Sequence, residues 1–260
     1  MQTPRQLIDE VRALFTGDPV YLAGSLMSAY TYDKPDAFSD VDLFLPNQQT
    51  LVYAATKLLC KGWVLDDKMQ KVWNRWLRYG TKQWHTNSLR MMDPRGQEWN
   101  LVYKLTDGHA VTSLGQVIES FDFGLLATGW DLETDTYRDM RPYLFPGMDP
   151  DGPLPMVPIK QRNWERGLIS QYNGLREPGR YAKYAQYGYD MSLIKPTLIQ
   201  GYENLVLYLE GHFDPDRQQW VAIYNALLDH IKLDNYDELI EAAAKINYKD
   251  SFDMVMEALE

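Results

Sequence analysis

Two short apolar segments, each carrying polar residues at fixed places, constrain this chain more than any other feature. The first ends in Gly24 and Ser25, and the second, residues 40–45, alternates Asp40 and Asp42 with apolar side chains. Side chains alternate between the two faces of a strand, so both aspartates are predicted to point the same way. Two neighbouring carboxylates repel each other unless a cation lies between them, and Mg²⁺ (or Mn²⁺) binds carboxylate and phosphate oxygens together. The pattern therefore predicts a divalent-metal site on a largely buried strand.

Composition excludes several classes of protein. The chain has 260 residues, 45% of them hydrophobic, which is enough for a sizeable core. It has no apolar run long enough to span a membrane and no signal-peptide pattern, so we expect a soluble, cytoplasmic protein. A single cysteine, Cys60, excludes a disulfide framework and a cysteine-based zinc site. The net charge of −10 argues against a non-specific nucleic-acid coat protein, which needs a basic surface.

Periodicity predicts an α+β N-terminal half followed by an α-helical C-terminal half. The expected limits are 1–140 for the first domain, 141–158 for a proline-rich connector and 159–260 for the helical domain. In the first domain we expect helices at 5–15, 26–30, 49–60 and 113–121, strands at 20–23 and 40–45, and a hairpin of 88–92 with 98–105. In the second we expect helices at 159–175, 180–187, 193–210, 216–231, 236–246 and 250–259, with a turn at Gly179.

A strand ending in Gly24-Ser25, a helix start, and a strand bearing Asp40-Val41-Asp42 together resemble the polymerase-beta-type nucleotidyltransferase superfamily, in particular its small phage-borne or defence-associated members. The resemblance covers roughly residues 18–125. It implies that Gly24 and Ser25 hold nucleotide phosphates and that Asp40 and Asp42 hold the metals. Residues 31–38 then form a loop that carries an insertion relative to the family.

The family expects a third carboxylate on a later strand, and this chain departs from that pattern. Asn100 falls where the acid is expected, with Glu98 two positions earlier on the same face. Small relatives carry Gln or Asn there and a Phe-Asp pair later, which Phe121-Asp122 matches. The resemblance thus implies that Asp122 serves as the third acid or as a strut for the first two. The alternatives are a solvated strand face for Glu98 and a buried helix-terminal cap for Asp122.

Basic and aromatic residues alternate between 160 and 195 in an otherwise acidic chain. Arg180 and Lys183, at i and i+3 of a predicted helix, are our candidates for nucleotide-phosphate contacts, because cationic side chains bind phosphate oxygens strongly. The alternative is a solvated amphipathic helix with tyrosines packed below it.

The leading hypothesis is a metal-dependent nucleotidyltransferase that moves a nucleoside monophosphate from an NTP such as ATP to a hydroxyl acceptor and releases pyrophosphate. Glu98 or Asp122 would lower the proton affinity of the acceptor. An RNA end such as that of tRNA, a protein hydroxyl and a small molecule all remain open as acceptors. The alternative is a catalytically weakened nucleotide- or partner-binding module on the same fold, which the uncharged Asn100 motivates.

Overall fold

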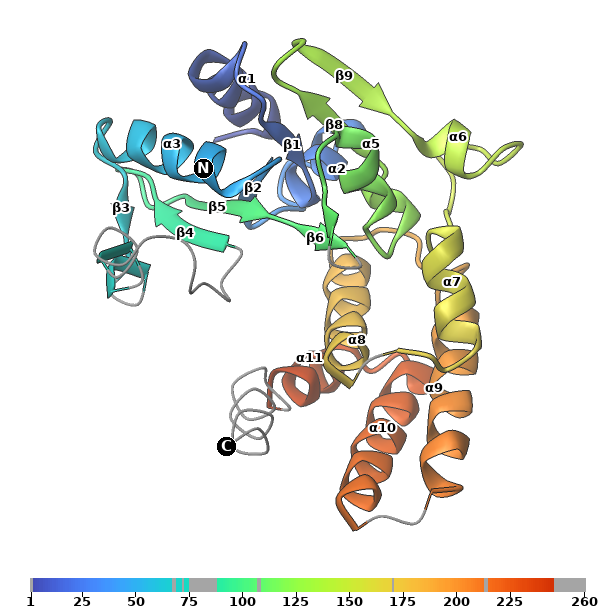
Figure 1. Ribbon diagram of the computed structural model, residues 1–260. Helices are drawn as coiled ribbons and strands as arrows, with labels where there is room; N and C mark the ends of the chain where they lie inside the picture. The colour runs from blue at the N-terminus through green and yellow to red at the C-terminus, as the bar shows by residue number, and fades with distance from the viewer. Residues whose placement is uncertain are drawn as a thin grey trace. The chain divides into compact units, whose positions relative to one another are not determined.

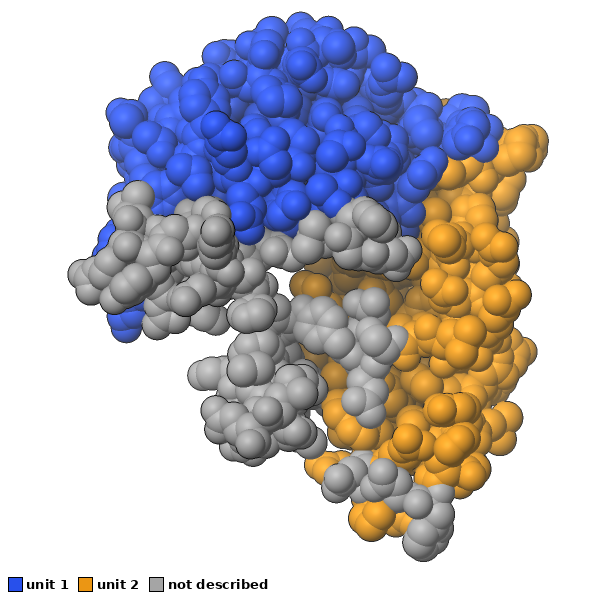
Figure 2. Space-filling model, viewed as in Figure 1, with its two compact units in different colours: residues 1–121, 125–143 blue, residues 122–124, 144–260 orange. Residues whose placement is uncertain are grey.

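The chain divides into two compact units in its structure, a computed structural model (Figure 2). The first unit comprises Met1–Phe121 and Leu125–Tyr143, and the second comprises Asp122–Gly124 and Leu144–Glu260. The main division therefore falls inside 141–158. The residues that the structure describes are 2–66, 69–71, 73–74, 88–106, 109–169, 171–212 and 215–245.

A mixed sheet forms the centre of the first unit, in the strand order β3-β4-β5-β2-β1-β8-β9 (Figure 1). Its central neighbours β2 and β5 are parallel, whereas the other neighbouring strands are antiparallel. The predicted strands and hairpin of this half are confirmed, as is the α+β class. The strand bounds are β1 Tyr21–Ala23, β2 Asp40–Leu45, β3 Val64–Leu65, β4 Ser88–Met92, β5 Glu98–Tyr103, β8 Thr128–Asp131 and β9 Thr136–Asp139. A separate ribbon pairs β6 Leu105–Thr106 with β7 His109–Ala110.

Local signals in the sequence explain where the helices of this unit begin. Thr3 and Gln6 form a capping box ahead of α1, and Pro4 occupies the first helical position. Asn47 caps α3 by accepting a hydrogen bond from the backbone N–H of Thr50. The helices predicted from periodicity are therefore present, with ends shifted by one or two residues. Their bounds are α1 Pro4–Phe15, α2 Ser25–Thr31, α3 Gln48–Leu59 and α5 Leu114–Glu119. A further short helix, α6 Arg141–Leu144, lies in the predicted connector and was not predicted.

Side chains along β2 and β5 point alternately to the two faces of the sheet, so one face is buried and the other is half-exposed. Val41, Leu43 and Trp99 are fully buried on the face that α3 covers. On the opposite face α5 packs against β1 and β8, and the Phe44 and Phe121 rings lie 5.6 Å apart. Apolar packing thus covers this second face over β1 and β8, while the polar ends of β2 and β5 stay only partly buried.

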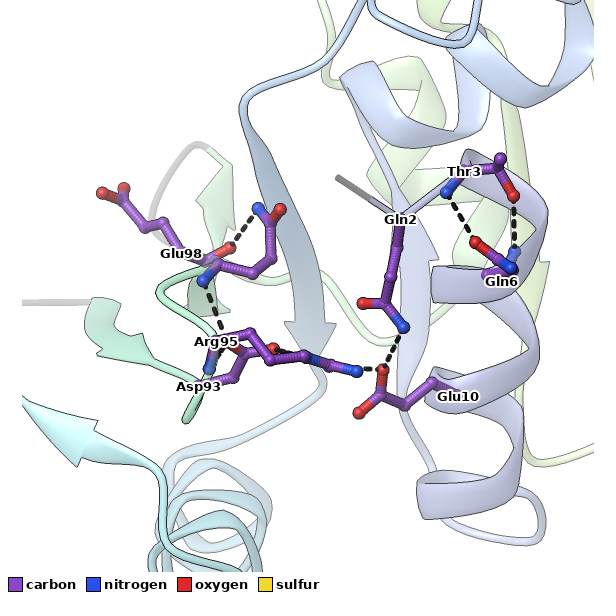
Figure 3. A network of polar contacts seen from close by, with 8 residues as sticks. Gln2, Thr3, Gln6, Glu10, Asp93, Arg95 and Glu98 are labelled. Atoms are coloured by element: carbon purple, nitrogen blue, oxygen red, sulfur yellow. Dashed lines mark hydrogen bonds and ion pairs between the residues drawn. The ribbon is translucent and has the colours of Figure 1, made fainter.

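A polar network joins α1 to the turn between β4 and β5 (Figure 3). Arg95 Nη2 lies 2.6 Å from Glu10 Oε2 and 2.6 Å from Asp93 Oδ2. Burial alone would raise the pKa of Asp93, but hydrogen bonds from the Arg95 side chain and from the backbone N–H groups of Gln97 and Arg95 lower that pKa below its ordinary value. The turn is thereby fixed at the entry to β5, whose first residue, Glu98, points away from this network (Figure 3).

The second unit is helical, and three aromatic side chains pack together in its core. The Tyr202 ring lies 5.0 Å from that of Trp164 and 5.5 Å from that of Tyr224. Gly201 allows this packing, because a Cβ there would collide with the Trp164 carbonyl oxygen. α9 packs against α7 and α10, and α11 packs against α8. The bounds are α7 Pro158–Glu165, α8 Gln171–Gln186, α9 Lys195–Glu210, α10 Pro215–Leu233 and α11 Tyr236–Lys245.

The predicted division into helices 159–175 and 180–187, with a turn at Gly179, places the break wrongly. The chain instead leaves the helix after Glu165, and α8 runs without interruption through Pro178. A proline inside a helix leaves the carbonyl four residues earlier without its N–H donor. Here that carbonyl belongs to Gly174, and the Tyr202 hydroxyl of α9 donates a hydrogen bond to it. A tertiary contact therefore compensates for the proline, and no local signal predicts such a contact.

The described residues bear on two further predictions only in part. The helix predicted at 250–259 lies outside the described residues. Among the residues that are described, no helix is both long and apolar enough to cross a membrane.

We predict that Gly129→Ala destabilises the first unit by about 1–3 kcal/mol, since a Cβ there would lie 2.6 Å from Leu114 Cδ1 and 2.9 Å from the Leu22 carbonyl oxygen. The matched control is Gly115→Ala in α5, where the nearest atom is 4.0 Å from the new Cβ. This control should be neutral or stabilise by roughly 0.5–1 kcal/mol. Urea unfolding measures both, and equal stability of the two variants would contradict the packing of α5 on β8.

Candidate functional site

The pairing of β2 with β5 brings four polar side chains onto one face of the sheet. In the parallel register Asp40 lies beside Glu98, and Asp42 lies beside Asn100. Asn100 Nδ2 is 2.7 Å from Asp40 Oδ2 and 3.1 Å from Asp42 Oδ1. The two carboxylates therefore converge on a single atom. A small cation at the position of Asn100 Nδ2 would contact both carboxylates.

The Gly-Ser turn at the end of β1 lies directly against these carboxylates. Gly24 has φ +92°, and a Cβ at this residue would lie 2.6 Å from Asp42 Oδ2, so only glycine fits without displacing the acid. Ser25 is buried, and its Oγ donates to Asp40 Oδ1 at 3.4 Å. Ser39 Oγ donates to the same oxygen at 3.0 Å. The turn and the acids thus form one cluster.

Two acidic side chains and three neutral hydrogen-bond donors make up this cluster. The donors contributed by Asn100, Ser25 and Ser39 are neutral, so they reduce the repulsion between the two acids without cancelling their charge. Within the described ranges, no group of three or more His, Cys, Asp or Glu residues is arranged to hold a metal. The donor set here is two carboxylates and an amide. That set fits Mg²⁺, which commonly takes one or two carboxylates and fills its remaining positions with water and phosphate oxygens.

Glu98 belongs to the same face but has a cationic neighbour. Its Oε1 lies 3.2 Å from Nε of Arg90, which is the register partner of Asn100 on β4. Both side chains are partly exposed. Glu98 is therefore beside the acid pair and held by an ion pair at the edge of the cluster.

Asp122 lies in the second unit, together with the two residues predicted to bind phosphates. Its Oδ2 accepts a hydrogen bond from Arg180 Nη1 at 2.7 Å, and Lys160 Nζ is 3.5 Å from its Oδ1. The structure thus brings the predicted third acid and one predicted phosphate contact together as an ion pair. Lys183, one turn further along α8, has its Nζ 5.7 Å from the centroid of the Tyr187 ring. The other predicted site residues, Gly24, Ser25, Asp40, Asp42 and Glu98, lie in the first unit.

Sequence reasoning missed Glu177, whose carboxyl group is next to Asp122. Burial, and then the charge of Asp122, raise the pKa of Glu177 to about 8. Flanked by Arg176 and Pro178, this residue has the local sequence of an exposed turn, and only its i, i+3 spacing to Arg180 indicated an ion pair.

Comparisons with known proteins add a distant similarity. No family model and no curated protein sequence matches the chain. A solved structure of a CCA-adding enzyme in complex with CTP is similar to 85% of this chain, with a TM-score of 0.41 and 14% sequence identity. The chain spans about half of that structure, with 51% of it covered. At this level of similarity, the geometry of β1, β2 and β5 has to carry any functional inference by itself.

We predict that Mg²⁺ and NTP together raise the melting temperature of the wild-type protein, and that Gly24→Ala, which displaces Asp42, abolishes this rise. Gly17→Ala is the matched control, because Gly17 also has a left-handed φ of +89° but has no atom within 4 Å of a new Cβ. Backbone strain should cost both variants roughly 1–2 kcal/mol. A Gly24→Ala protein that keeps the wild-type response to Mg²⁺ and NTP would contradict this reading of the turn.

We predict that Glu177→Gln flattens the dependence of stability on pH. The raised pKa means that the folded protein keeps a proton that the unfolded chain releases above about pH 4.5. The contribution of Glu177 to the free energy of unfolding is therefore fully present below that pH. It is lost as the pH rises toward about 8, at up to ~1.4 kcal/mol per pH unit. Urea unfolding from pH 5 to 9 measures the slope. The control Glu203→Gln, at a partly exposed residue paired with Lys232, should keep the wild-type slope. An unchanged slope in Glu177→Gln would refute the assignment.

Proposed function

We propose that this chain is a metal-dependent nucleotidyltransferase that moves a nucleoside monophosphate from an NTP to a hydroxyl acceptor and releases pyrophosphate. The observation that carries the proposal is the convergence of Asp40 and Asp42 on one atom, 2.7 and 3.1 Å away, beside the Gly24-Ser25 turn. An acid pair backed by a turn of small residues combines cation ligands with room for a phosphate to approach the backbone.

Asp40 and Asp42 would hold Mg²⁺ or Mn²⁺ in this proposal. When bound, the metal would neutralise phosphate charge and lower the pKa of the attacking hydroxyl. Asn100 Nδ2, which contacts both carboxylates in the structure, would give up this place to the metal. Glu98, the register partner of Asp40, would accept the proton of the acceptor hydroxyl, directly or through water. Asp122 stays a predicted alternative for this role.

Gly24 and Ser25 would bind the nucleotide phosphates. The absence of a Cβ at Gly24 leaves its backbone accessible next to Asp42, and the Ser25 hydroxyl can donate to a phosphate oxygen in place of Asp40. α2, which begins at Ser25, has seven residues, so we assign the phosphate contacts to the turn and not to a helix dipole. Arg180 and Lys183 stay predicted phosphate contacts.

The acceptor is proposed only as a class. An RNA end such as that of tRNA, a protein hydroxyl and a small molecule all provide the hydroxyl group that the transfer needs. The net charge of −10 favours a protein or a cationic small molecule over a long nucleic acid, because phosphates would be repelled over most of the surface.

A second candidate function is a nucleotide-binding or partner-binding module without transfer. The observation that favours it is Asn100, whose neutral amide hydrogen-bonds both acids where a third carboxylate would complete a two-metal site. Melting experiments separate the candidates. Stabilisation by NTP that requires Mg²⁺, combined with no transfer to RNA, protein or small molecules from cell extract, would favour the binding module.

We predict that Asp40→Asn and Asp42→Asn each lower transfer from labelled NTP by a factor on the order of 10²–10³, because each removes a charge that would hold the metal at the reacting phosphate. The control is Asp36→Asn, an exposed carboxylate four residues before Asp40 in the same segment. Labelled NTP is incubated with protein and cell extract, and label is counted in RNA, protein and small-molecule fractions. Full activity of an Asp40→Asn, Asp42→Asn double variant would refute the proposed function.

A further inference from the structure

A pocket of about 250 Å³ lies within the second unit, between α7, the residues that follow it, and α8. Its polar wall consists of Asp122, Lys160, Asn163 and Glu177. The volume equals that of about eight water molecules, so the pocket suits a small ligand and not a nucleotide. All of its lining belongs to one unit, so this is a different site from the acid pair on β2.

The Glu177 carboxyl group has an oxygen in this pocket that makes no hydrogen bond. The side chain is only 6% exposed, and its Oε2 has no hydrogen-bond partner in the part of the chain that the structure describes. Arg180 Nη1 is 3.6 Å from Oε2, which is beyond hydrogen-bonding distance. A buried polar atom without a partner is costly, so a ligand that bonds to Oε2 gains binding energy there.

The position of the proton on Glu177 decides what kind of ligand atom fits. Burial and the charge of Asp122 raise the pKa of Glu177 to about 8, so this carboxyl group keeps a proton near neutral pH. The proton lies on the contact with Asp122, because two carboxyl groups in contact cannot both ionise cheaply. Oε2 is therefore a hydrogen-bond acceptor, and its partner has to be an N–H or O–H group.

The charges of the pocket disfavour an ion of either sign. Asp122 accepts a hydrogen bond from Arg180 at 2.7 Å, and Lys160 Nζ lies 3.5 Å from its other oxygen. A carboxylate ligand would lie against Asp122, and an ammonium ligand would lie against Lys160 and beside Arg180. Burying an uncompensated charge is costly, so a neutral donor fits this lining best. Lys160 can in turn donate a hydrogen bond to an acceptor on the same ligand.

The remaining wall of the pocket is apolar. It consists of Trp164, which is buried, and of Leu168 and Ile169. Leu168 is 68% exposed, so a large apolar side chain borders the pocket without being covered. A water molecule at Oε2 would leave this wall unused, whereas a ligand with an apolar body would bury it.

We propose that this pocket binds a small, neutral primary carboxamide with an apolar body. The amide N–H donates a hydrogen bond to Glu177 Oε2, and the amide carbonyl oxygen accepts one from Lys160. The body packs against Trp164, Leu168 and Ile169. A carboxamide combines a donor and an acceptor without net charge, which matches the polar wall of this pocket.

The test compares small probes that share a branched apolar body. Isobutyramide carries the donor and the acceptor, and 3-methylbutan-2-one has the same shape with a methyl group in place of the NH₂ donor. Isobutyrate and isobutylammonium carry a negative and a positive charge. Ligand-observed NMR titration of the full chain at pH 7 measures the four dissociation constants.

We expect isobutyramide to bind at least about tenfold more tightly than each of the other three probes. Isobutyramide and 3-methylbutan-2-one differ only in the donor, so this pair tests the bond to Glu177 Oε2 in the wild-type protein. Equal affinity for these two probes, tighter binding of either ion, or no binding of isobutyramide overturns the proposal.

Two substitutions of the same residue assign the contact. Glu177→Gln keeps the site, because its side-chain N–H can donate to Asp122 while its oxygen accepts from the ligand, so isobutyramide should bind within a few-fold of wild type. Glu177→Met removes the acceptor and should weaken isobutyramide binding about tenfold or more. Glu203→Met, the same change at a partly exposed residue paired with Lys232, is the control and should leave binding unchanged.

Thermal melting establishes that each variant is folded before binding is measured. Unchanged affinity in folded Glu177→Met, or loss of binding in folded Glu177→Gln, refutes the assignment. If Glu177→Met does not fold, the comparison of isobutyramide with 3-methylbutan-2-one in the wild-type protein still decides the question. None of these outcomes depends on nucleotidyl transfer, so the proposal stands or falls separately from the proposed function.

Discussion

The proximity of two like charges on β2 is the constraint on which the first unit depends. Asp40 and Asp42 share a face because the strand alternates, and the three apolar residues that follow Asp42 hold that strand in the core. The neighbouring strands then have to accommodate the charges. β5 supplies Asn100, which bonds both carboxylates, and β1 is followed by Gly24, whose missing Cβ leaves space for Asp42. Stability alone would favour apolar residues at these positions, and the proposed function gives a reason for the carboxylates there.

The second unit also contains two neighbouring acidic side chains, but different groups surround them. Asp122 and Glu177 are both largely buried, and Arg180 and Lys160 lie close to Asp122. A shared proton and nearby cations make this buried acid pair tolerable, whereas the acid pair on β2 has neutral donors around it.

Much of the first unit followed from local patterns in the sequence. Alternation predicted that Asp40 and Asp42 share a face, and the turn at 93–96 predicted the hairpin that places β5. What could not be predicted depends on contacts distant in sequence. Gly179 was predicted to mark a turn, but the Tyr202 hydroxyl from α9 compensates for Pro178, and α8 continues through both residues. Glu177 was missed for the same reason, since its burial comes from helices that no local pattern places beside it. Arg180 was predicted to meet phosphate, and its hydrogen bond to Asp122 joins residues 58 apart in the chain, which no local pattern predicts.

The central claim is that Asp40 and Asp42 form a cation site that acts together with a nucleotide. The most direct measurement is electron paramagnetic resonance of Mn²⁺ titrated into the protein with a non-hydrolysable ATP analogue. The account predicts bound Mn²⁺ in the wild type, tighter binding in Asn100→Asp, which adds a third carboxylate at the same point, and loss of binding in the Asp40→Asn, Asp42→Asn double variant. Bound Mn²⁺ that is equal in the wild type and in the double variant would contradict it.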